Sequence, residues 1–541
     1  MFYNQAQLQA LPEIQISGDQ ANLSGSLQAQ LQALNLYNRS IMFYIQSFLN
    51  IKDDDVYEII KLNLKNFYKV EHLSLSFYKV YMQSPEIKNL MDIFLEYLIN
   101  IKEFTLKLYK SNLNKAKLDQ ILTNLKYFQN IEIVNMECSE VANTTPKQIA
   151  INLQQLKNLK NIQFQACNFP QASSIQFFEE LSKIQTIKEM KLNFDDNCLS
   201  NGGMKALGNM LLQLKQLQKL HLSLRQCKLS CEGLQFLGQG VSECKTLNSL
   251  YIDITNNSLE SKFLFEFAVE IKKWNHLNQL SLILPYIGCD QKTVNAFTEG
   301  FESLKKMRYF KLHISSINEI FYSRNQQQKD LLEMKSFNKF MKSFSNIIQL
   351  DIQINQKCFV SLLNQLKYCE SIQYLSFSID LSEQSESILN YSKDQIARAL
   401  QNLENIENIN IFLYNNSHTN QINEDLQNLI ISQIKSLHST SNLCLDFKIK
   451  RQFIFNNQQL AQPFLQYIQQ YIDSLNHLQN SLEHITLNFG YQKVDFLEIS
   501  SLKKIKNLKT LQFYNTHFSK KQIQELRKIK RLVNINYKLN Q

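Results

Sequence analysis

Cysteine and histidine side chains that could bind a metal gather near the middle of the chain. Cys227, Cys231 and Cys244 follow His221 within a short stretch. Zinc takes four such ligands in tetrahedral geometry, commonly from closely spaced pairs. Two of these cysteines occupy places that recur elsewhere in the chain as Asn, Leu or Trp. We therefore interpret them as structural residues and expect no metal and no cofactor.

Two adjacent aspartates could in principle perform acid–base catalysis. Asp195 and Asp196 follow an alternating apolar stretch, and two carboxylates held together can perform acid–base catalysis. Successive residues at a strand end point to opposite sides, so we interpret the pair as a solvated turn. The sequence has no Gly-rich phosphate loop, no Gly-x-Ser-x-Gly and no His-Glu-x-x-His motif. We expect a protein that is not an enzyme.

The strongest charge feature is the C-terminal segment 501–541. The chain has a formal net charge of +10, and this segment alone carries eleven Lys or Arg and a single acid, Glu525. Such clusters attract phosphates, acidic protein tails or anionic lipid. Apolar residues spaced by three between 523 and 532 favour instead a capping repeat with a basic outer face, and both interpretations stay open. The candidates for acidic-partner binding are Lys520, Lys521, Arg527, Lys528, Lys530 and Arg531.

The elements that carry these residues repeat with a period of thirty. The stretch LQKLHLSLRQCKL, residues 217–229, returns as LNSLYIDITNNSL at 247–259. Apolar residues alternate within each copy, which indicates a strand with one buried face. Apolar residues in the second half of each unit are spaced by three or four, which indicates an α-helix. Trp274 belongs to this helical stripe, and we expect it in the core.

One strand–turn–helix unit cannot bury both its strand face and its helix stripe, whereas stacked units can. Helices need about 10 Å of lateral space and strands about 4.8 Å, so a stack of such units curves. The sequence therefore predicts an α/β solenoid with a curved parallel sheet on the concave side and helices on the convex side.

The repeat resembles the leucine-rich repeat family, specifically its ribonuclease-inhibitor-like class. The residues that carry the resemblance are Leu-x-x-Leu-x-Leu at 217–222 and 277–282 and the same motif ending in Ile at 247–252, each followed by a helix. The resemblance implies a leucine-rich-repeat solenoid. It also implies a second functional hypothesis, because some members of this class activate small GTPases such as Ran.

This chain departs from the family pattern at one position. The family places Asn or Cys three residues after the last leucine of that motif, where this sequence has Arg225 and Thr255. Asn197, Cys227 and Asn257 come two positions later. The resemblance implies a ladder of such side chains bonded to the backbone, and the departure leaves its presence here open.

The repeat is regular over 155–315 and irregular over 316–500. We expect a solenoid over 51–541 that ends in a basic C-terminal cap at 501–541. Residues 1–50 are rich in Gln and Ala, and we expect a helical or partly ordered cap there. The largest insertion, 315–335, is either a tolerated loop or a functional one.

Side chains between the buried anchors of each strand point to the open sheet face. They mix aromatic, basic and acidic types, which suits a protein partner better than a polyanion. The candidate binding residues are Lys191, Asn193, His221, Ser223, Tyr251, Asp253, Ser281, Lys311, His313 and Asp351.

The favoured function is a non-enzymatic scaffold that binds a protein partner through the concave face and the edge loops. A regulator of Ran-like GTPases is one alternative. Binding of an acidic polymer, such as RNA or tubulin tails, through the C-terminal cations is another, although few aromatic residues there could stack on bases.

No leader peptide and no apolar run long enough to span a membrane are visible, and the ten cysteines are not paired in spacing. We expect a cytoplasmic protein.

Overall fold

The chain forms two compact units, Met1–Glu270 and Ile271–Gln541. The computed structural model describes residues 13–16, 40–46, 54–65, 69–78, 84–109, 115–139, 146–166, 171–199, 201–257, 259, 261–285, 291–315, 346–355, 366, 369–380, 405–415, 440–449, 469–470, 472–478, 480–488, 502, 504–514, 524 and 534–537.

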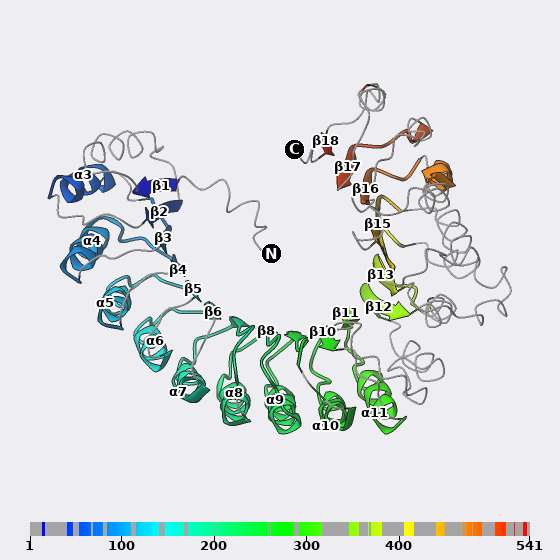
Figure 1. Ribbon diagram of the computed structural model, residues 1–541, viewed down its shortest axis with the longest axis horizontal. Coiled ribbons are helices and arrows are strands. Elements are labelled where there is room, and N and C mark those ends of the chain that lie inside the picture. The colour runs from blue at the N-terminus through cyan, green and yellow to red at the C-terminus, as the bar shows by residue number, and fades with distance from the viewer. Residues whose placement is uncertain are drawn as a thin grey trace, which may run out of the picture. The chain divides into compact units, whose positions relative to one another are not determined.

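In unit 1, strands and helices alternate, and each strand pairs in parallel with the next one along the chain (Figure 1). The described helices lie on one side of these strands, and no described helix covers the other face, which we call the open face (Figure 1). The strands are β1 Glu13–Ile16, β2 Ser40–Gln46, β3 His72–Tyr78, β4 Glu103–Tyr109, β5 Ile133–Ser139, β6 Asn161–Ala166, β7 Glu189–Asn193, β8 Lys219–Ser223 and β9 Ser249–Asp253. The helices are α3 Asp54–Leu64, α4 Ser84–Tyr97, α5 Lys115–Leu125, α6 Pro146–Leu153, α7 Gln171–Leu181, α8 Asn201–Gln213, α9 Cys231–Glu243 and α10 Ser261–Ile271.

Unit 2 continues with parallel strands, again paired in chain order. Its described elements are β10 Gln279–Pro285, α11 Gln291–Glu302, β11 Tyr309–Ser315, β12 Gln349–Asn355, β13 Tyr374–Asp380, β14 Asn408–Asn415, β15 Asn442–Ile449, the 3-10 helix Leu475–Leu478, β16 His484–Asn488, β17 Thr510–Tyr514 and β18 Asn534–Tyr537.

The core of each unit lies between strands and helices, as the alternation predicts. Leu220 and Leu222 of β8 are fully buried on the helix side, whereas His221 between them is half-buried on the open side. Leu207 and Leu211 of α8 are buried opposite them. Trp274 is also completely buried, which confirms its predicted place in the core. The predicted α/β leucine-rich-repeat fold is therefore confirmed.

Helices α8 and α9 approach each other through glycines. A Cβ placed on Gly208 would lie 2.5 Å from the carbonyl oxygen of Phe236, and one on Gly240 would lie 2.6 Å from Cα of Gly208. Such distances are well inside van der Waals contact, so only glycine permits this spacing.

Of residues 1–50, which we expected to form a helical or partly ordered cap, the structure describes 13–16 and 40–46. Two strands, β1 and β2, lie there and pair in parallel with each other, and β2 pairs with β3. The insertion at 316–335 lies outside the described residues. Among the helices that the structure describes, none is long and apolar enough to cross a membrane.

Candidate functional site

Strands β7, β8 and β9 form one stretch of the open face in unit 1. Lys191, His221 and Tyr251 occupy matching positions on these three neighbouring strands. The rings of His221 and Tyr251 are stacked, with centroids 3.8 Å apart and planes 4° from parallel. Parallel strands lie about 4.8 Å apart, so neighbouring flat side chains can stack without distorting the backbone. These three residues form what we call the aromatic row.

The environment of the aromatic row keeps its two rings uncharged at neutral pH. Burial lowers the pKa of His221 to about 4, and the nearby ammonium of Lys191 adds to this effect against the opposing charge of Asp195. Burial raises the pKa of Tyr251 to about 12, and the carboxylate of Asp253 contributes in the same direction. The row therefore presents a neutral imidazole and a neutral phenol beside one cation.

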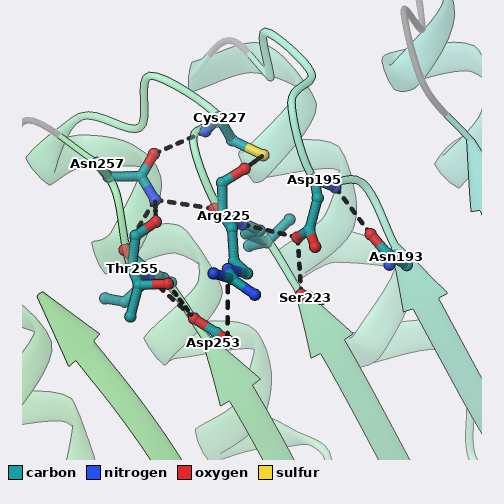
Figure 2. Close-up of polar contacts among 10 residues, drawn as sticks. Asn193, Asp195, Ser223, Arg225, Cys227, Asp253, Thr255 and Asn257 are labelled. Carbon is teal, nitrogen blue, oxygen red and sulfur yellow. Dashed lines mark hydrogen bonds and ion pairs between the residues drawn. The ribbon is translucent and has the colours of Figure 1, made fainter. Parts of the chain in front are cut away.

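A second row lies one pleat further along the same strands. Asn193, Ser223 and Asp253 occupy matching positions, and Ser223 and Asp253 are buried. The hydroxyl of Ser223 donates to Oδ1 of Asp195 at 2.7 Å, and the backbone N–H of Arg225 donates to the same oxygen at 2.9 Å. Figure 2 shows this chain of contacts passing from one repeat to the next.

The carboxylate of Asp253 is held in a similar way. Its Oδ1 accepts from the backbone N–H of Thr255 at 3.0 Å and from the Thr255 hydroxyl at 2.7 Å. Its Oδ2 lies 4.0 Å from Nε of Arg225, a weak ion pair (Figure 2). Asp195 and Asp253 are therefore used to fix the ends of the strands, which agrees with the interpretation of Asp195 as a turn residue.

Three residues cross-link the face at this end: Asp195, which the sequence places in a turn, and Arg225 and Thr255, which sequence reasoning did not name as site residues. They are spaced by thirty, so they occupy the same place in successive units. The residues that follow them, Asp196, Gln226 and Asn256, all have positive φ angles of 54° to 62°. The repetition of one turn conformation was the signal that could have identified this set.

Beneath the turns, the displaced Asn and Cys residues form the ladder that the resemblance implies. Nδ2 of Asn257 donates to the carbonyls of Leu224 and Ile254, both at 2.8 Å. Its Oδ1 accepts from the backbone N–H of Cys227 at 2.9 Å (Figure 2) and from that of Leu229 at 3.1 Å. Asn197 likewise donates to the carbonyl of Ala166 at 2.7 Å. The ladder satisfies backbone groups that the turns would otherwise bury without partners.

The thiols are occupied by structural contacts. Sγ of Cys227 donates to the carbonyl of Phe194 at 2.9 Å, and burial raises the pKa of Cys227 to about 12. Burial also raises the pKa of Cys244. The thiolate is the nucleophilic form of cysteine, so burial disfavours a nucleophilic role for both residues. Within the described residues no cluster of three or more metal-ligating side chains occurs.

The predicted face residues of unit 2 form a separate polar group. Ser281, Lys311 and Asp351 occupy matching positions on β10, β11 and β12. The carboxylate of Asp351 contacts Nζ of Lys311 and Nε2 of His313, each at 2.8 Å. Burial alone would raise the pKa of Asp351, but the bond to His313 and the charges of His313 and Lys311 outweigh it and lower the value to about 2. Asp351 is thus ionised and tied to its own sheet.

The six C-terminal cations Lys520, Lys521, Arg527, Lys528, Lys530 and Arg531 lie outside the described residues. The acidic-partner hypothesis built on them stays a prediction.

The fold and this face define a leucine-rich-repeat solenoid. No protein-family model and no curated protein sequence matches the chain. Among solved structures, a leucine-rich-repeat protein of Leptospira interrogans is similar at 15% identity and a TM-score of 0.36, covering 88% of this chain and 97% of its own. A Bacteroides fragilis protein is similar at 13% identity and a TM-score of 0.30, covering 55% of this chain and 75% of its own. At these TM-scores the likenesses carry no argument about function.

Proposed function

We propose that the protein is a non-enzymatic scaffold of the ribonuclease-inhibitor-like class, and that the open face of β7–β9 binds a protein partner in the cytoplasm. The observation that carries the proposal is the stacked pair of His221 and Tyr251 beside Lys191. Flat aromatic rings with polar edges are frequent at protein interfaces because they bury much area and still form hydrogen bonds.

Rigidity of the face supports the same proposal. Asn193, Ser223 and Asp253 are held by turn residues or by their own backbone before any partner arrives. Binding to side chains that are already ordered loses less conformational entropy, so more of the contact free energy appears as affinity. A non-enzymatic role agrees with the protonated Cys227 thiol and with the use of both nearby carboxylates in fixing turns.

The test compares two triple variants in proximity labelling in the native cell. One removes the aromatic row through Lys191→Ala, His221→Ala and Tyr251→Ala. Its control removes three exposed residues at equivalent helical positions of the same repeats, through Asn209→Ala, Gln239→Ala and Val269→Ala. We expect the first variant to lose specific neighbours that the second keeps, followed by at least a tenfold weaker Kd with the purified neighbour. Equal labelling profiles for the two variants would contradict the proposal.

The two alternatives stay predictions with simple tests. A Ran-like regulator would accelerate GTP hydrolysis by a small GTPase, and unchanged hydrolysis removes that hypothesis. An acidic-polymer binder would lose salt-sensitive binding on deletion of residues 501–541, and binding that survives this deletion removes the other.

A further inference from the structure

In both units one residue of each repeat lies directly before the strand, at the edge where the strands begin. Backbone hydrogen bonds join these residues in order, as from Lys102 N to the carbonyl of Glu71 at 2.7 Å and from Lys160 N to that of Glu132 at 2.8 Å. We call this series the pre-strand row. Its members are neighbours through the backbone, so their side chains stand side by side along the edge.

Most cations of the pre-strand row are neutralised within the row. In unit 1, Nζ of Lys102 lies 2.8 Å from Oε1 of Glu71, and Nζ of Lys160 lies 2.9 Å from Oε1 of Glu132. In unit 2, Nζ of Lys509 lies 2.7 Å from Oε2 of Glu483. Acid and base alternate at these places, and the edge carries little net charge there.

The alternation ends in unit 1, where Lys188 follows Lys160 in the row, and it is also absent around Arg308 at the start of unit 2. The backbone N–H of Arg308 donates to Asn278 at 2.8 Å, that of Ile348 to Arg308 at 2.8 Å, and that of Gln373 to Ile348 at 2.9 Å. The neighbours of Arg308 in the row are therefore an amide and an isoleucine instead of an acid. Among the described residues no ion pair is formed by the Arg308 side chain.

Two further cations join Arg308 at this edge. Lys305 and Lys306 belong to the turn between α11 and β11, and all three side chains are exposed. Together with amide and hydroxyl side chains from the next repeats they line an open pocket of about 1060 Å³. No carboxylate is among its described lining residues, which are His276, Asn278, Lys305, Lys306, Arg308, Asn346, Ile348, Ser371, Gln373 and Asn405.

We propose that this pocket binds a small diffusible molecule that carries two or more phosphate groups. Three cations with no carboxylate between them repel one another, and a multiply charged anion removes that repulsion. The guanidinium of Arg308 suits a phosphate through paired hydrogen bonds, and the lysines add point charges. Asn and Gln side chains supply neutral donors around them.

The polarity of the pocket favours a small molecule over a macromolecule. Its volume of about 1060 Å³ is just above the usual range of about 300–1,000 Å³ for small-molecule sites. Ile348 is the single aliphatic side chain among the described lining residues. A protein interface has a more apolar centre, and a membrane-binding surface needs apolar residues that insert beside the cations.

The test measures binding of sodium tripolyphosphate to the full chain by calorimetry at several salt concentrations. The variant Lys305→Gln, Lys306→Gln, Arg308→Gln is compared with Lys102→Gln, Lys160→Gln, Lys509→Gln, which removes the same number of cations from paired positions in the pre-strand row. We expect Arg308→Gln alone to weaken binding about tenfold, and the triple pocket variant to weaken it further. The paired-position variant should keep the wild-type Kd within about twofold.

Four outcomes would overturn the proposal. The first two are that the wild type does not bind tripolyphosphate, or that both triple variants weaken its binding equally. The other two are that the protein binds a hexaglutamate peptide more tightly than tripolyphosphate, or that it binds only vesicles that contain phosphoinositides. Thermal unfolding of each variant shows whether it is folded, and the single Arg308→Gln variant serves as the readout if the triple variant is not. The aromatic-row variant leaves this pocket intact, so failure here is distinguishable from failure of the scaffold proposal.

Discussion

The imidazole of His221 lies flat against the phenol ring of Tyr251, at 3.8 Å between centroids, although thirty residues separate them in the chain. The period of the repeat places the two residues on adjacent strands at the same height, and the close spacing of parallel strands brings the rings into contact. The aromatic row is thus a direct product of the repeat, and its electrostatic state follows from its burial.

The first prediction concerns the titration of His221. Its pKa is about 4 in the folded protein, against about 6.5 in an unfolded chain. The unfolded state therefore binds the proton first, and stability falls as the pH drops from about 6.5 to about 4. An NMR titration of the imidazole should give a midpoint near 4, and Lys191→Gln should raise it. A midpoint near 6.5 would show that the ring is not held in this buried stack.

The second prediction concerns Asp351 in unit 2. Its folded pKa of about 2 lies below the unfolded value of about 3.9, so it contributes stability above pH 4 that is lost as the pH falls through 2. Asp351→Asn should lower the free energy of unfolding by about 2 kcal/mol at pH 7. Urea unfolding followed by Trp274 fluorescence measures this, because Trp274 is buried in the same unit. A variant as stable as the wild type at pH 7 would argue against the contacts to Lys311 and His313.

The third prediction concerns the ladder. Asn257→Ala leaves the N–H groups of Cys227 and Leu229 without their acceptor and should cost about 3 kcal/mol of stability. Cys227→Ala should cost less, about 1 kcal/mol, because a thiol is a weak donor. Chemical denaturation gives both values. The reverse order would show that the ladder depends on the thiol instead of the amide.

The fourth prediction concerns the contact between α8 and α9. Gly208→Ala brings a methyl group against the Phe236 carbonyl and should destabilise unit 1 by about 2 kcal/mol. Asn209→Ala, at an exposed position of the same helix, is the control and should be neutral or slightly stabilising through helix propensity. Thermal unfolding compares the two, and equal midpoints would contradict the tight packing.

The fifth prediction concerns thiol reactivity. Cys198 is exposed, whereas Cys138, Cys227 and Cys369 are buried with pKa values raised by burial to about 12. Alkylation of the native protein followed by mass spectrometry should modify Cys198 within minutes and the three buried thiols only after unfolding. Rapid labelling of Cys227 would mean that the turns above it open readily.

The comparison of sequence and structure is clearest in the regular repeats. Alternation at Leu220 and Leu222 and the three-to-four spacing at Leu207 and Leu211 are local signals, and they placed β8 and α8 correctly. Strands β1 and β2 carry no copy of the leucine pattern, and they are recognisable only through their pairing, β1 with β2 and β2 with β3.

Sequence by itself determined the period, the strand–turn–helix unit and the sheet face on which His221 and Tyr251 lie, because each of these follows from spacing along the chain. Tertiary structure decided the protonation states of the buried side chains and which residues become neighbours across long insertions. The pKa of His221 depends on what covers it, and the neighbours of Arg308 depend on β12 joining the sheet after a long insertion. Burial and register across insertions are properties of the packed chain, and no short-range pattern encodes them.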